Sequence, residues 1–320
     1  MTSTPHPTPF ASMSSQSRRF DPPSPREAFA LARKLDAARP PQTTPGHRLY
    51  WMTSGSFGSC DLAAASSAAV VVGSHPLCDV RLLDEVSVSL RHLLVRSSLV
   101  DDGCPLLSVL DLHTAHGFYL SNGATERSID ATGAIVIRVG GYAIVALPSD
   151  RVAPEELPAP ICQAALESPY RAATFSPELL ARPLDRSSRI TLFPRVVDAV
   201  ESERSIQKHE RDIYEITMSG VMGTRTVRVP SRDLRRGILV GRSLDCDPSL
   251  RAVVDMGISR GHLLLLKDRH GAIAYDLSST QGTWFFGRRS RAVELTDSGT
   301  VLVIGAGQRI TLSWRSVTNL

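Results

Sequence analysis

The chain has 320 residues, of which 42% are hydrophobic, and a formal net charge of only +4 at pH 7. This length and composition predict about two domains with hydrophobic cores, and so small a net charge does not call for a nucleic-acid partner. The five cysteines form no CxxC pair and show no metal-ligand spacing. No apolar run approaches the roughly 18 residues of a membrane span, and the polar N-terminus has no signal-peptide pattern. We therefore expect a soluble cytoplasmic protein without a metal or other cofactor.

The first 46 residues divide into a tail and a short helix. Residues 1–23 are rich in Ser, Thr and Pro and are expected to be disordered, because they contain too little apolar surface to repay ordering. A helix is predicted at 24–39, where Ser24 can cap the first turn, Pro25 suits the first helical position and Glu27 completes a capping box. This helix either docks on the neighbouring domain or binds a partner.

The remaining chain predicts an all-β fold in two parts. At 47–148 and again at 211–317, short apolar runs alternate with polar turns, which is typical of an antiparallel β-sandwich. Between them, 149–210 is rich in proline and is predicted to be a partly helical linker. Within the linker, 189–193 alternates like a strand and 196–209 is compatible with a helix, and periodicity does not decide between the two.

Three polar blocks in the second region suit a bound oxyanion. They are Gly241–Asp247, Gly257–His262 and Asp276–Thr283, with short apolar runs between them. Together they offer a guanidinium, several hydroxyls and an amide, which are the groups that bind phosphate. The sequence therefore predicts an anion site on the loop edge of the second sandwich.

The order of these blocks resembles the forkhead-associated (FHA) domain, with Gly-Arg, then Ser-x-x-His, then Asp-Leu-x-Ser-x-Asn-Gly-Thr. One position departs from this pattern, because Gln281 stands where the family usually has Asn. The resemblance implies an FHA/SMAD-like antiparallel sandwich that binds phosphothreonine peptides. It implies that the phosphopeptide-binding residues are Arg242, Ser259, Thr280 and Gln281, and that the site is supported by Gly241, His262 and Gly282.

An internal repeat at offsets of 165 to 170 residues indicates two copies of this sandwich. Small drifts in the offset correspond to changes in loop length, which surface loops tolerate. The aligned pairs are Gly73 with Gly241, Cys78 with Cys246, Ser89 with Ser259, His92 with His262, Asp111 with Asp276, Gly117 with Gly282 and Gly140 with Gly305.

The first copy lacks most of the phosphate-binding groups. Ser74 stands at the arginine position, and Ala115 and His116 replace the Thr-Asn pair. Only Ser89 and His92 of the signature remain. The resemblance therefore implies that the first copy is degenerate and that the second copy has the groups needed to bind phosphate.

The predicted binding residues of the second copy should differ in how much they contribute to phosphate binding. Phosphothreonine carries about −1.5 to −2 charge and three acceptor oxygens, and each hydrogen bond to a charged group is worth roughly 1.5–3 kcal/mol. The permanently charged fork of Arg242 should therefore matter more than the hydroxyl of Ser259 or Thr280. Gln281 carries the family's amide on a longer stem, so its position is less fixed.

Two functions remain open. The first is a non-enzymatic signalling adaptor whose second FHA domain docks a Ser/Thr-phosphorylated protein, such as a kinase or its substrate, or the chain's own phosphorylated tail, which would allow self-association. The second is a phosphate-independent structural scaffold of a larger complex, which Gln281 and the degenerate first copy favour.

Other classes are not expected. A Ser259–His262 catalytic dyad would need a Gly-x-Ser-x-Gly elbow and an orienting acid, and neither is evident. The arginine-rich stretches 232–236 and 288–291 are interpreted as solvated loops rather than nucleic-acid contacts, because they lack interleaved aromatic residues. We therefore predict protein–protein interaction, with no role for nucleic acid or membrane.

Overall fold

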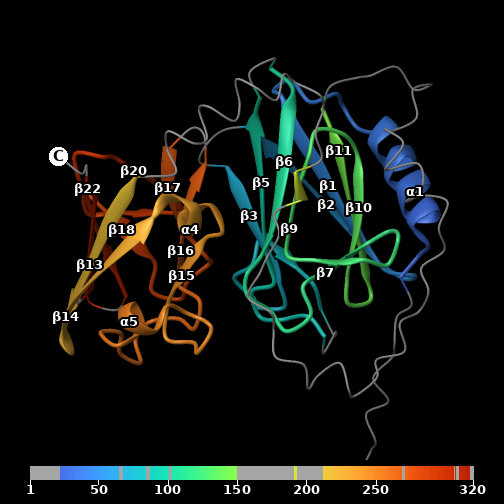
Figure 1. The fold of residues 1–320 in the computed structure, drawn as a ribbon. Helices are drawn as coiled ribbons and strands as arrows, with labels where there is room; N and C mark the ends of the chain where they lie inside the picture. The colour runs from blue at the N-terminus through green and yellow to red at the C-terminus, as the bar shows by residue number, and fades with distance from the viewer. Residues whose placement is uncertain are drawn as a thin grey trace, which may run out of the picture.

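The structure is a computed structural model (Figure 1), which describes most of the two predicted sandwiches and the helix before them. The predicted tail and linker lie outside the described residues, except at 22–23, at 149 and in the backbone of 191–192. These last two residues form strand β12 (Thr191–Leu192), which falls within the strand-like stretch predicted at 189–193. The described ranges are 22–64, 68–83, 87–100, 103–149, 191–192, 212–268, 271–305, 307 and 310–317. No helix within these ranges has the length and apolar character needed to cross a membrane.

Helix α1 (Pro25–Ala37) begins where the sequence predicts, and both halves of the capping box are present. The Glu27 amide donates to Ser24 Oγ at 3.3 Å, and the Glu27 carboxylate accepts from the Ser24 amide at 2.9 Å. One face of the helix buries Ala28 and Ala32 in a cluster with the outer face of the first sandwich, and this cluster also includes Tyr50, Met52, Val136, Ala143, Val145 and Leu147. The docking alternative is thus confirmed.

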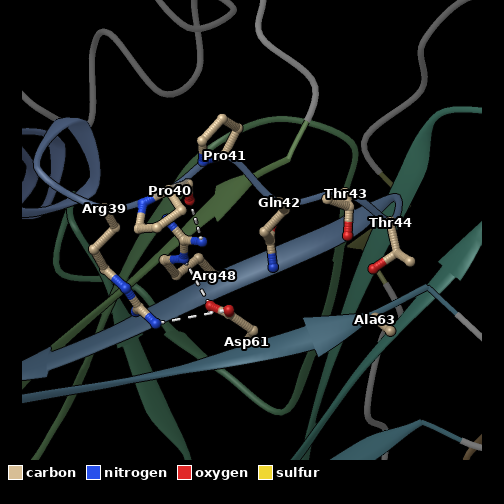
Figure 2. Close-up of a pocket in the computed structure, with 9 residues that line it drawn as sticks. All are labelled: Arg39, Pro40, Pro41, Gln42, Thr43, Thr44, Arg48, Asp61 and Ala63. Atoms are coloured by element: carbon tan, nitrogen blue, oxygen red, sulfur yellow. Dashed lines mark hydrogen bonds and ion pairs between the residues drawn. The ribbon is translucent and has the colours of Figure 1, made fainter.

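A buried arginine, Arg48, ties the end of this helix to the sheet, and Figure 2 shows its bonds to Pro40 and Asp61. The Arg48 guanidinium lies 2.8 Å from the carboxylate of Asp36 at the end of α1 and 2.6 Å from that of Asp61, and it donates to the Pro40 carbonyl at 3.2 Å. Breaking these bonds would leave a buried charge unpaired, which is costly. They therefore hold the segment after α1 in place. Arg48, Asp61 and Pro40 also line a polar pocket of about 320 Å³ in the first sandwich.

The first sandwich consists of two sheets whose inner faces share one apolar core. All pairings are antiparallel except β3 with β4 and β12 with β9. One sheet runs in the order β2 (Phe57–Ala63), β1 (Gly46–Met52), β11 (Tyr142–Pro148), β10 (Ile135–Val139), β7 (Phe118–Leu120) and β8 (Thr125–Glu126). The other runs in the order β12, β9 (Ser128–Ala131), β6 (Pro105–Asp111), β5 (Leu93–Leu99), β3 (Ala69–Gly73) and β4 (Val80–Arg81).

The second sandwich repeats this plan with antiparallel pairings throughout, around a core that includes Trp314 stacked on Tyr214. Two short helices lie in its connections, α4 (Ser231–Arg235) and α5 (Pro248–Arg251). One sheet runs in the order β14 (Gly223–Pro230), β13 (Ile213–Gly220), β22 (Ile310–Val317), β21 (Thr300–Ile304), β18 (Thr283–Phe285) and β19 (Arg288–Ser290). The other runs in the order β15 (Ile238–Val240), β16 (Leu263–Asp268), β17 (Gly271–Asp276) and β20 (Ala292–Leu295).

The two sandwiches pack against each other through one sheet of each, so that β3 and β5 lie beside β15 and β16 (Figure 1). The consecutive leucines of β16 show the consequence. Leu263 and Leu265 point into the sandwich core, whereas Leu264 and Leu266 belong to the cluster between the two sandwiches. A strand buried on both faces needs apolar residues at every position.

Candidate functional site

The third polar block forms a turn held by one buried carboxylate at the end of β17. Asp276 accepts from the backbone amide of Ser279 at 2.7 Å and from its hydroxyl at 2.6 Å, and it also accepts from the Thr283 hydroxyl at 2.8 Å. The Ser279 hydroxyl in turn accepts from the Gly282 amide at 2.9 Å. These bonds leave the intervening residues, Thr280 and Gln281, exposed at the tip of the turn.

Two residues of this turn have left-handed backbone conformations. Ser278 has a φ of 55°, which is costly for a residue with a Cβ, and Gly282 has a φ of 80°. A Cβ on Gly282 would lie 2.5 Å from Nε of Arg289, whose guanidinium donates to the Ser279 carbonyl at 3.0 Å. The turn is therefore both strained and tightly supported.

The second polar block is joined to this turn through His262 and Ser259. The His262 ring is fully buried; its Nε2 lies 3.2 Å from the Gly282 carbonyl, and its Nδ1 accepts from the Ser259 amide at 3.4 Å. Because a carbonyl oxygen only accepts, Nε2 carries the proton. Burial lowers the pKa of His262, against the opposing effects of Asp276 and the Gly282 bond, which favours this neutral form.

Ser259 positions the tip of the turn directly. Its hydroxyl oxygen accepts from the Thr280 amide at 3.1 Å, which leaves its proton available for another acceptor. Both ring nitrogens of His262 bond to backbone groups, so the structure contains no Ser259–His262 proton relay. Among the described residues, no group of three His, Cys, Asp or Glu side chains is placed to hold a metal ion.

Arg242 lies at the end of β15, beside the same serine. Its amide donates to the Ser259 carbonyl at 3.2 Å, and its Nε donates to the Ile258 carbonyl at 2.9 Å. A Cβ on the preceding Gly241 would lie only 2.1 Å from the Arg260 carbonyl. Gly241 therefore serves a close approach of two loops.

The predicted binding residues are thus gathered on one loop edge. Arg242, Thr280 and Gln281 are exposed, and the Ser259 hydroxyl, though the residue is largely buried, bonds directly to the Thr280 backbone. The exposed guanidinium, the hydroxyls and the amide offer hydrogen-bond donors, and no carboxylate in the described part of the chain is bonded to any of them. Such a site suits an oxyanion carried by an extended ligand.

The first sandwich repeats the histidine and aspartate bonds at the centre of this frame. His92 Nδ1 accepts from the Ser89 amide at 3.1 Å, and its Nε2 lies 2.7 Å from the Gly117 carbonyl. Thr114, which takes the place of Ser279, bonds to Asp111 through both its amide and its hydroxyl. The frame is therefore common to both sandwiches.

The exposed donors are what differ. The Ser74 hydroxyl, at the position of Arg242, donates to the Val88 carbonyl at 3.2 Å. Ala115 has no polar side chain, and His116 stands where the second sandwich has Gln281. The loop edge of the first sandwich thus lacks the guanidinium and the hydroxyl of the second.

The arginine-rich stretches were only partly predicted. Arg232 is exposed, as predicted for a solvated stretch, but Ser231–Arg235 forms helix α4 and not a loop. In contrast, Arg289 supports the Ser279 carbonyl, and Arg291 forms a 2.6 Å ion pair with Asp79 of the first sandwich. The interpretation of 288–291 as a solvated loop was therefore wrong. No sequence signal identified these two residues, because Arg289 bonds to a backbone carbonyl, which any residue can supply, and the partner of Arg291 lies in the other sandwich.

Fold and site together define a β-sandwich whose loop edge carries exposed hydrogen-bond donors. The family model of the FHA domain matches residues 238–305, which include all three polar blocks. This match confirms the predicted resemblance for the second sandwich. The FHA domain is a non-enzymatic module that binds phosphopeptides.

Solved structures similar to this chain are FHA domains. None of the curated proteins compared with the chain matches it. The similar structures include the FHA-1 domain of Rv1747 from Mycobacterium tuberculosis (26% identity, TM-score 0.26, covering 32% of this chain and 96% of that one). They also include the FHA domain of CT664 from Chlamydia trachomatis (17%, 0.27, 32% and 96%). A third is the MEK1 FHA domain in complex with a HOP1 phosphothreonine peptide (20%, 0.25, 32% and 97%).

Proposed function

We propose that this chain is a cytoplasmic, non-enzymatic signalling adaptor whose second sandwich docks a phosphothreonine segment of a partner protein. The observation that carries the proposal is the convergence of Arg242, Ser259 and Thr280. Two bonds fix this convergence: Thr280 to Ser259 Oγ at 3.1 Å, and Arg242 to the Ser259 carbonyl at 3.2 Å. Three donors for one phosphate are thereby held on a frame that forms before the ligand arrives.

Each residue has a distinct role in this proposal. The Arg242 guanidinium supplies the positive charge for the phosphate, and the Ser259 proton and the Thr280 hydroxyl supply the remaining donors. Gln281, exposed beside Thr280, contacts the peptide backbone through its amide. The proposed ligand is thus an extended peptide that lies across the loop edge.

We further propose that the first sandwich is a second, degenerate FHA-like domain, so that the chain is a tandem repeat. The repeated bonds around His92 and Asp111 support this view, while Ser74 and Ala115 remove the donors for phosphate. The first sandwich therefore acts by packing rather than by reading phosphate.

The test is a titration of the full chain with a phosphothreonine peptide library and the same peptides without phosphate. We expect selected peptides to bind only when phosphorylated, and Arg242→Ala to weaken binding about 10- to 100-fold, since a charge-assisted hydrogen bond is worth roughly 1.5–3 kcal/mol. Two matched variants serve as controls: Ser89→Ala changes the equivalent serine of the first sandwich, and Arg33→Ala removes an exposed charge on α1. Equal binding of phosphorylated and unphosphorylated peptides, or unchanged binding by Arg242→Ala, would refute the proposal.

One observation favours a second function, a phosphate-independent scaffold. Gln281 departs from the family's asparagine at the tip of the turn. Capture of a partner that survives both phosphatase treatment and the Arg242→Ala change would support the scaffold instead. Loss of the partner under either condition would support the phosphothreonine adaptor, and the captured partner would show whether it is a kinase, a substrate or a second copy with a phosphorylated tail.

A further inference from the structure

The interface between the sandwiches uses the same positions of both repeats. Eleven buried residues form its apolar centre, and eight of them are four aligned pairs. An interface in which one surface meets its own equivalent is the arrangement of a two-fold dimer, here within one chain. The aligned pairs are Val71 with Leu239, Cys78 with Cys246, Leu94 with Leu264 and Leu112 with Leu277.

Three arginines cross this interface at its polar margin. Arg96 of β5 pairs with Asp268 at the far end of β16, and Arg291 of the second sandwich pairs with Asp79 of the first. The third, Arg91, comes from the loop before β5 and reaches the second sandwich's turn. Its Nε donates to the Leu277 carbonyl and its Nη2 donates to the Ser278 carbonyl, the latter at 2.6 Å.

The position of these two carbonyls gives Arg91 its significance. Leu277 and Ser278 directly precede the turn that presents Thr280 and Gln281, and Ser278 is the residue with the strained, left-handed backbone. Arg289 holds the next carbonyl, that of Ser279. Three consecutive carbonyls at the base of the turn are therefore bonded to guanidinium groups, and two of them depend on the first sandwich.

The contact is also one-sided, although the interface is built from equivalent surfaces. At an offset of 170 residues, the position of Arg91 is occupied in the second sandwich by Gly261. Glycine has no side chain that could reach the equivalent carbonyls of Leu112 and His113. The two bonds from Arg91, here called the clamp, therefore act only on the turn of the second sandwich, which carries the phosphate-binding groups.

We propose that Arg91 is a positioning residue for the phosphopeptide site. Through this one guanidinium, the first sandwich fixes the backbone of the loop that presents Thr280 and Gln281, although it binds no phosphate itself. The inference rests on the proposed function, and it gives the degenerate repeat a role in that function.

The test compares three variants of the full chain, two at Arg91 and one at a separate ion pair of the same interface. Arg91→Ala removes the clamp, and Arg91→Lys retains the charge but not the planar fork that serves two carbonyls. Asp268→Asn weakens the Arg96 ion pair roughly 17 Å away, since five residues of β16 at about 3.3 Å each separate it from the site. Phosphopeptide affinity and the hydrogen exchange of the Ser279, Thr280 and Gly282 amides are measured for each variant.

We expect Arg91→Ala to weaken phosphopeptide binding about tenfold, near the lower end of the value of one charge-assisted hydrogen bond, because it acts through the loop. The three amides should exchange faster in Arg91→Ala, less so in Arg91→Lys, and at the wild-type rate in Asp268→Asn. Wild-type affinity and exchange in Arg91→Ala would overturn the inference, as would equal effects of Arg91→Ala and Asp268→Asn. A wild-type chain that binds no phosphopeptide refutes the proposed function instead, and the exchange rates then still decide whether Arg91 orders the turn.

Discussion

Replacement of His262 by alanine tests whether one buried ring joins the two halves of the site. The ring is fully buried, donates from Nε2 to the Gly282 carbonyl at 3.2 Å and accepts at Nδ1 from the Ser259 amide at 3.4 Å. Alanine leaves the Ser259 amide unpaired and the Gly282 carbonyl with only its 3.4 Å bond from the Gly305 amide, and a buried group left unpaired costs roughly 1–3 kcal/mol. Because the 3.4 Å bond is long, we expect His262→Ala to reduce the free energy of unfolding by about 2–4 kcal/mol.

The matched change is His92→Ala in the first sandwich, where the corresponding distances are 2.7 Å and 3.1 Å. Urea denaturation followed by circular dichroism should give a loss at least as large for His92→Ala as for His262→Ala. Phosphopeptide affinity of folded His262→Ala should also fall about tenfold or more, since Ser259 and the turn at Gly282 are no longer held together. A stability loss below about 1 kcal/mol, with unchanged affinity, would refute the bracing role.

Three further predictions concern single residues. Gly282→Ala should lower the free energy of unfolding by at least about 2 kcal/mol, because a Cβ would lie 2.5 Å from the Arg289 side chain. Gly123 has a similar φ of 84° but open space around it, so Gly123→Ala should cost only about 1 kcal/mol. Equal unfolding midpoints for the two variants would contradict the steric argument. Gln281→Asn should tighten phosphopeptide binding about two- to fivefold in calorimetry, because a shorter side chain loses less rotamer entropy on binding; weaker binding would mean that the longer stem is needed. Burial lowers the pKa of His47 to about 4, so the unfolded chain takes up the proton first, and stability present above pH 6.5 is lost as the pH falls through 4. At pH 5.5 the loss in free energy of unfolding should be about 1.4 kcal/mol, measured by urea denaturation. The His47→Gln variant should not show this loss. An equal loss in both proteins would exclude His47 as its source.

Strands whose apolar residues face the core could be predicted from the sequence. The short apolar runs at Ile238–Val240 and Phe118–Leu120 form β15 and β7. In contrast, β2 (Phe57–Ala63) was missed, because this edge strand is mostly exposed or half-buried and has no apolar alternation. Its conformation comes from pairing with β1, which local sequence does not encode.

The sequence contains an indication that the two sandwiches pack together, but periodicity alone does not distinguish it from a buried helix. A run of four leucines at 263–266 fits a strand buried on both faces, and the structure shows this arrangement. The same run is compatible with a buried helical segment. The covering surface, which includes Val71 and Leu94, lies some 170 residues earlier in the chain.

The residues of the site were predictable where a short motif contains them. Arg242, Ser259 and Thr280 were found in this way, and the structure places them together. Arg91 and Arg289 were not found, because each bonds to backbone carbonyls, which any residue can supply. Only the fold brings these arginines to the turn.

The central claim is that the loop edge of the second sandwich, and not that of the first, binds phosphothreonine. Its most direct test is to record backbone amide chemical shifts of the full chain while a phosphothreonine peptide is added. The shifts should change at 241–243, 259–260 and 279–282, and stay constant at 73–75 and 115–116. Changes confined to the first sandwich, or equal changes with the unphosphorylated peptide, would contradict the claim.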